Sequence, residues 1–199
     1  MQKSSTTLKI LFLTTNGIDR LDSSLEFVAK VIEFAEHLSY IGDYNYSEVH
    51  AEIILDGWAY SACGSPPNNC VMKYRINPRI LSLPCVEIVE MPLLHVAKLK
   101  QFLDLAVETP SRYSIPVWDF VLPKILLNYM DPDVPCDDPK AWKFLYCSQF
   151  VLLILRFCAR EGLFAIPKSK IEILDSNHIN SHTCSPAHLR HLLHTILSQ

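Results

Sequence analysis

The longest apolar run in the chain covers residues 150–158 and is interrupted only by Arg156; Arg160 and Gly162 follow it. It is much shorter than the roughly 18 apolar residues that a membrane span requires. We therefore expect a buried helix over residues 148–161 that ends at the glycine. A helix that is apolar on most sides has to be covered by other elements, so the fold must be built around it.

The elements before this helix are expected to include several strands. Residues 8–14 and 47–55 are rich in aliphatic and β-branched residues. Asp56-Gly57 is a typical two-residue hairpin turn, so residues 58–63 are expected to form the returning strand. Further strands are expected over residues 70–75, 86–91 and 171–174.

Helices are expected around these strands. Residues 25–40 and 96–107 carry apolar side chains at helical spacing, and residues 118–129 are also expected to be helical. Ser185-Pro186 has the composition of a helix start, with the helix continuing to Leu197. The pattern predicts a single α+β domain over residues 1–199, with a central antiparallel sheet packed against helices.

Composition narrows the classes of function. A net charge of −3 without a Lys/Arg cluster does not favour nucleic-acid binding, and five scattered glycines form no phosphate loop. The sequence shows no secretory signal and no transmembrane segment, so we expect an intracellular, cytoplasmic protein. Its seven cysteines are then expected to be free thiols.

Cys147 is the candidate nucleophile because it lies at the start of the expected apolar helix. The first N–H groups of a helix have no intrahelical partner and stabilise an anion, so they lower the pKa of a thiol at that position. The same N–H groups can form an oxyanion hole. The alternative is a buried structural cysteine, which is the interpretation we give to Cys158 in the same helix.

His50 is the candidate general base, at the beginning of the strand that precedes the Asp56-Gly57 turn. A third group should orient the imidazole. Glu52 shares the strand face of His50, but a separation of two residues along one strand is a poor angle for holding the ring. The side chains that could reach the ring from other strands are Ser61, Tyr60 and Glu87.

Metal binding is the main chemical alternative. Cys63 and Cys70 lack the C-x-x-C spacing of a zinc site. A second group of possible ligands lies near the C-terminus and comprises His178, His182, Cys184, His188, His191 and His194. It contains no fixed metal motif, so a solvated histidine-rich helix is the preferred interpretation, and neither a metal nor a cofactor is expected.

Four segments in this order resemble the circularly permuted papain-like cysteine hydrolases. They are residues 49–57 (VHAEIILDG), 112–116 (RYSIP), 144–151 (FLYCSQFV) and 184–189 (CSPAHL). This family includes lecithin retinol acyltransferase, bacterial lipid or peptide amidases and proteins of large DNA viruses. The resemblance covers most of the chain from Tyr46 onward. It implies a permuted papain-like fold with the nucleophile at the N-terminus of the core helix.

The resemblance also implies the chemistry of the site. Cys147 would be the nucleophile, His50 the base and Tyr113 a donor to the oxyanion, acting on a peptide or lipid amide or ester. Ser61 stands where many relatives carry a carboxylate or histidine, and Gln149 stands where relatives commonly have Glu. These two departures keep open the alternative of a catalytically inactive interaction module.

Overall fold

The structure is a computed structural model, and it describes residues 6–14, 48–63, 70–83, 86–113, 134–175, 179, 181 and 184–198. The helices predicted over residues 25–40 and 118–129 lie outside these ranges. The other predicted elements fall within them.

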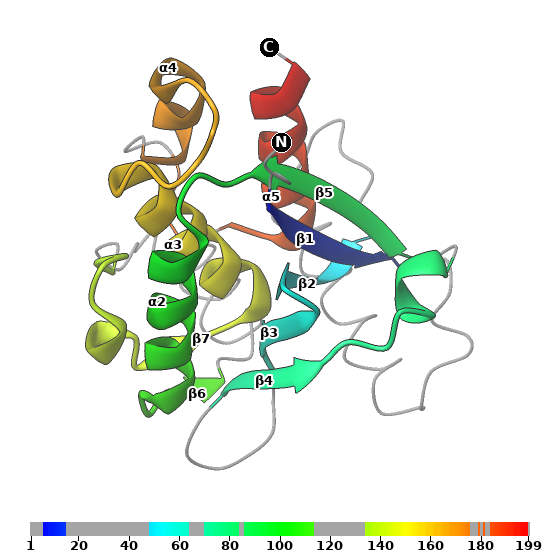
Figure 1. The fold of residues 1–199 in the computed structure, drawn as a ribbon. Helices are drawn as coiled ribbons and strands as arrows, with labels where there is room; N and C mark the ends of the chain where they lie inside the picture. The colour runs from blue at the N-terminus through cyan, green and yellow to red at the C-terminus, as the bar shows by residue number, and fades with distance from the viewer. Residues whose placement is uncertain are drawn as a thin grey trace, which may run out of the picture.

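A five-stranded antiparallel sheet forms the centre of the described fold, in the strand order β4-β3-β2-β1-β5 (Figure 1). Each strand lies within two residues of its predicted bounds. The strands are β1 (Thr7–Thr14), β2 (Glu48–Leu55), β3 (Trp58–Ala62), β4 (Val71–Arg75) and β5 (Val86–Pro92). The α+β class and the antiparallel sheet are therefore confirmed.

The turn between β2 and β3 has the geometry that its sequence predicts. Asp56 and Gly57 both have positive φ angles, 51° and 75°. Positive φ at both central residues defines the type I′ turn, whose twist matches that of the flanking strands. The turn fixes the register of the hairpin by pairing Leu55 with Trp58.

Helices cover one face of the sheet, and Figure 1 shows α2 and α3 beside it. The α-helices among the described residues are α2 (Val96–Glu108), α3 (Cys147–Arg160), α4 (Lys168–Ile171) and α5 (Pro186–Ser198). The same part of the chain contains the short 3-10 helices η2 (Ile80–Ser82), η5 (Pro139–Ala141) and η6 (Glu172–Asp175). None of the helices in the described part of the chain is long and apolar enough to cross a membrane.

The core is centred on α3, as the apolar run predicts. Every residue of this helix from Cys147 to Cys158 is buried. The helix packs against β2 and β3, while α2 and α5 contribute further apolar side chains to the same core. Ser185 caps α5 as expected, because its Oγ accepts a hydrogen bond from the His188 N–H at 3.1 Å.

The strand predicted over residues 171–174 is wrong, because this segment is helical. Ile171 ends α4, and η6 follows it directly. Ile171 and Leu174 are both buried, whereas Ile173 between them is 38% exposed. Burial at a spacing of three residues is helical, and a strand would have buried alternate residues instead.

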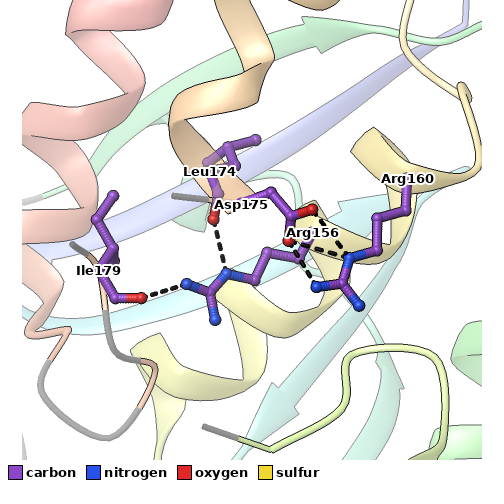
Figure 2. Close-up of polar contacts among 5 residues, drawn as sticks. All are labelled: Arg156, Arg160, Leu174, Asp175 and Ile179. Carbon is purple, nitrogen blue, oxygen red and sulfur yellow. Dashed lines mark hydrogen bonds and ion pairs between the residues drawn. The ribbon is translucent and has the colours of Figure 1, made fainter. Parts of the chain in front are cut away.

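Arg156 lies inside the core and holds the chain that follows α4. Its Nε donates to the Leu174 carbonyl at 2.6 Å, and an Nη donates to the Ile179 carbonyl (Figure 2). Arg160, one turn later on α3, forms an exposed bidentate pair with Asp175. The arginine inside the apolar run and the one just after it therefore connect α3 to Leu174, Asp175 and Ile179.

Candidate active site

The site begins where β2 and β3 stop pairing. Their ladder runs from Leu55↔Trp58 to Ile53↔Tyr60. Continuing this register would place Ala51 opposite Ala62, but no such pair forms within the ladder. The two strands therefore separate at this end, and the backbone N–H of Ala51 hydrogen bonds to the sulfur of Cys147 instead.

Cys147 is the first residue of α3, and Tyr146 is its N-cap. The thiol also receives the backbone N–H of Ser148 and a hydrogen bond from His50. The helix start and the open end of the hairpin thus meet at one sulfur atom. This is the placement that the helix-start argument predicts for a nucleophile.

The environment of Cys147 favours its thiolate. Burial alone would raise the pKa of the thiol, but the charge of His50, its hydrogen bond and the two backbone N–H groups outweigh burial and lower the pKa. Burial instead raises the pKa values of Cys70, Cys136 and Cys158. The six described cysteines are all free thiols, and Cys147 differs from these three in having a histidine partner.

His50 connects the sulfur to a carboxylate. Its Nε2 lies 2.9 Å from Glu52 Oε1 and 3.0 Å from Ser61 Oγ, which leaves Nδ1 for Cys147. Burial would lower the pKa of His50, but the charge and hydrogen bond of Cys147, together with Glu52, raise it well above its ordinary value. Both pKa shifts act in the direction of a thiolate beside an imidazolium.

Glu52 is the orienting group that the sequence analysis set aside. The expectation of a poor angle is wrong, because side chains two residues apart on a strand share a face and a long Glu side chain can lean along the strand. Glu52 is only 8% exposed, and its carboxylate accepts hydrogen bonds from His50, Ser61 and Tyr74. Burial would raise the pKa of Glu52, but these hydrogen bonds and the charge of His50 lower it.

The other two candidates for orienting His50 lie elsewhere. The Tyr60 hydroxyl donates to Asp104 at 3.3 Å. Glu87 accepts from Arg190 on α5 at 2.6 Å and also pairs with His194. Both contacts connect a strand of the sheet to a helix away from Cys147.

A short parallel pairing of two strands brings Tyr113 to the site. In this bridge β6 (Arg112–Tyr113) pairs with β7 (Phe144–Leu145), and Tyr113 is opposite Leu145. Burial and the neighbouring Cys147 charge raise the pKa of Tyr113, so the hydroxyl keeps its proton and hydrogen bonds with Cys147. The predicted residues Cys147, His50, Ser61 and Tyr113 are thus together.

Polar side chains on either side of Cys147 fix the first turn of α3 to the segment before α5. Tyr146 donates its hydroxyl to the Ser181 carbonyl at 2.7 Å, and Ser148 donates to the Cys184 carbonyl at 2.6 Å. Gln149 is fully buried and donates to Ser181 Oγ at 3.4 Å. Gln149 therefore has a structural partner away from His50.

The described residues contain no group of three or more His, Cys, Asp or Glu side chains able to hold a metal ion. Of the possible ligands considered from the sequence, Cys184 is buried before α5 and His194 pairs with Glu87. His178 and His182 lie outside the described residues.

Comparison with known proteins gives no match: no family model, curated protein or solved structure is significantly similar to this chain. The chemistry of the site therefore rests on its own geometry. A stabilised thiolate, an oriented imidazolium, helix N–H groups and a tyrosine hydroxyl are the parts that acyl transfer requires.

Two residues of the candidate site were not assigned to it from the sequence: Glu52, which was judged a poor partner for His50, and Tyr74, the partner of Glu52, which was not considered. The strand alternation that put His50 and Glu52 on one face was the available signal for the first. The register set by the Asp56-Gly57 turn, continued one position beyond the ladder, brings Ser61 of β3 to the side of Glu52. Tyr74 had no sequence signal, because it reaches the site from β4.

Proposed function

We propose that this chain is a cysteine hydrolase or acyltransferase with a circularly permuted papain-like fold, acting on an amide or ester. The observation that carries the proposal is the hydrogen-bonded pair of Cys147 and His50, in which both pKa shifts favour thiolate and imidazolium. The order of the elements supports the fold assignment, since the strand that bears the base precedes the helix that bears the nucleophile.

The reaction begins with attack of the Cys147 thiolate on the substrate carbonyl carbon. The carbonyl electron pair moves onto oxygen, and the backbone N–H of Cys147 with the Tyr113 hydroxyl stabilises this oxyanion. His50 then gives its proton to the leaving amine or alcohol as the carbon–heteroatom bond breaks. The product of this half-reaction is a thioester on Cys147.

The second half-reaction restores the thiol site. Neutral His50 removes a proton from water, or from an acceptor amine or alcohol, as that group attacks the thioester. The acyl group leaves with the new nucleophile, and the thiolate and imidazolium are regenerated. Throughout both steps Glu52 keeps the imidazole in one orientation and stabilises its positive form.

The test is selective labelling of Cys147. Wild-type protein treated with iodoacetamide at neutral pH should be alkylated first at Cys147, as measured by peptide mass spectrometry. His50→Ala should remove this preference, while His194→Ala, which changes a histidine paired with Glu87 on the surface, should preserve it. Equal labelling of the thiols in wild-type protein would reject the proposal.

Acyl transfer itself is tested with an activated ester such as p-nitrophenyl acetate. We expect release of nitrophenolate and an acetyl group on Cys147, visible in the intact mass after rapid acid quenching. Both signals should be absent in Cys147→Ser. Labelling of Cys147 by iodoacetamide without any acetylation by the ester would indicate a reactive thiol that is not an acyl-transfer enzyme.

A further inference from the structure

The two oxygens of the Glu52 carboxylate have different partners. Oε1 lies 2.9 Å from His50 Nε2, and Oε2 accepts the Tyr74 hydroxyl at 2.5 Å. We propose that Tyr74 is a positioning residue of the thiol site, holding Glu52 in the orientation in which it receives the His50 N–H. The inference rests on the proposed function, because it assigns a further member to the same site.

The sheet is built so that Tyr74 can reach across a strand. Tyr74 on β4 pairs with Ala59 of β3, and Ala59 also pairs with Ile54 of β2. The small side chain of Ala59 is fully buried, and the Tyr74 ring packs against the cluster of Ala59, Ile54 and Leu11. This packing fixes the direction of the ring, so its hydroxyl reaches a carboxylate two strands away.

The protonation states suit this role. Burial and the neighbouring Glu52 charge raise the pKa of Tyr74, so its hydroxyl remains a donor. The carboxylate of Glu52 is ionised and nearly buried, and such a group depends on every donor it has. Loss of the Tyr74 hydroxyl leaves Oε2 with one donor fewer and frees the carboxylate to rotate away from His50.

The groups that face His50 and Glu52 come from several elements. His50 faces Glu52 on its own strand, Ser61 on β3 and Cys147 on α3. Glu52 faces His50, Ser61 and Tyr74. The thiol of Cys63, just after β3, also influences Tyr74 electrostatically. Ser61 donates to the same carboxylate, so we expect the Tyr74 change to weaken the orientation without abolishing it.

The experiment uses Tyr74→Phe in the full chain, which keeps the packed ring and removes only the hydroxyl. Alkylation of Cys147 by iodoacetamide is followed from pH 4 to 9 by peptide mass spectrometry. Hydrogen bonds to charged groups are stronger than those between neutral groups, and we expect the loss of this one to weaken the stabilisation of the Cys147 thiolate through Glu52 and His50. At pH values below the midpoint of the rate–pH curve, the alkylation rate of Cys147 should therefore fall about threefold to tenfold. The midpoint itself should move to higher pH.

Tyr60→Phe is the matched control, since Tyr60 also donates to a carboxylate but belongs to the Asp104 contact outside the site. Its pH profile should coincide with that of wild type. Glu52→Gln should shift the profile more than Tyr74→Phe does. Adding Tyr74→Phe to Glu52→Gln should then change the rate by less than about twofold, because the tyrosine acts through Glu52.

Three results would overturn the inference. The first is a Tyr74→Phe profile that coincides with wild type while Glu52→Gln is shifted, which would leave the proposed function intact. The second is full additivity of the two changes, which would indicate a general structural effect of Tyr74. The third is a wild-type Cys147 that titrates like an ordinary thiol, which would remove the proposed function together with this inference.

Discussion

Replacing Arg156 with methionine should destabilise the fold strongly, although it places an apolar residue in an apolar core. Arg156 is 4% exposed and supplies the hydrogen-bond donors for the carbonyls of Leu174 and Ile179. Methionine retains much of the side-chain length but has no donor. Both carbonyls would then lose a donor in an environment from which water is largely excluded.

The magnitude follows from the number of carbonyls. A buried polar group left without its partner costs about 1–3 kcal/mol, so two of them cost about 2–6 kcal/mol. Unfolding free energies of natural domains are typically about 5–15 kcal/mol, so this is a large part of the total. We expect Arg156→Met to lower the free energy of unfolding by this amount, as measured by the shift of its urea unfolding curve to lower urea concentration. Hydrogen exchange should also become faster at residues 172–175, which this arginine holds.

Arg160→Met is the matched control on the same helix. Arg160 binds Asp175 through an exposed bidentate pair, and its side chain is 49% exposed. Exposed ion pairs contribute about 0–1 kcal/mol, so this variant should unfold near the wild-type urea concentration. If Arg156→Met unfolded within about 1 kcal/mol of wild type, or no earlier than Arg160→Met, the argument from unpaired carbonyls would be refuted.

Two further predictions concern the sheet and its turn. Burial would raise the pKa of Glu87, but its pairs with Arg190 and His194 lower it. These ion pairs therefore stabilise the fold at pH values above the pKa of Glu in the unfolded chain. Their contribution is lost as the pH falls through the lower pKa of the folded protein. Glu87→Gln should therefore flatten the acid side of a plot of unfolding free energy against pH, and an unchanged acid side would contradict this. Gly57→Ala should cost about 1 kcal/mol in urea unfolding because Gly57 has a φ of 75°, even though an added Cβ would meet only Arg75 Nη1 at 3.5 Å. Asp56→Asn should be nearly neutral, since Asn also tolerates positive φ, and equal effects of the two turn variants would count against the backbone argument.

The parts of the fold that sequence predicted are those determined by local patterns. Asp56-Gly57 specified a turn and with it the β2–β3 register, and the apolar run specified α3. Residues 171–174 misled because two isoleucines and a leucine in four positions have strand-like composition. The helical burial of Ile171 and Leu174 depends on how η6 packs against α3 and α4 packs against η6.

The part of the candidate site that could be predicted is the part that depends on residue types and on their order in the sequence. A cysteine at a helix start and a histidine on a strand indicated the candidate nucleophile and base, and the two residues lie in contact. The environment of His50 was not predictable, because it depends on side-chain directions across three strands. Glu52 was judged from spacing alone, and Tyr74 reaches Glu52 only because Ala59 leaves space between them.

The early end of the β2–β3 ladder makes the chemistry sensitive to the length of a distant turn. Ala51 is free to bind the sulfur of Cys147 because pairing stops at Ile53↔Tyr60. A single residue inserted at Asp56-Gly57 would shift the pairing of β2 with β3 by one position and turn every side chain of the shifted strand to the opposite face. Ser61 would then no longer face His50, so hairpins of unaltered length should be favoured in any set of functional variants.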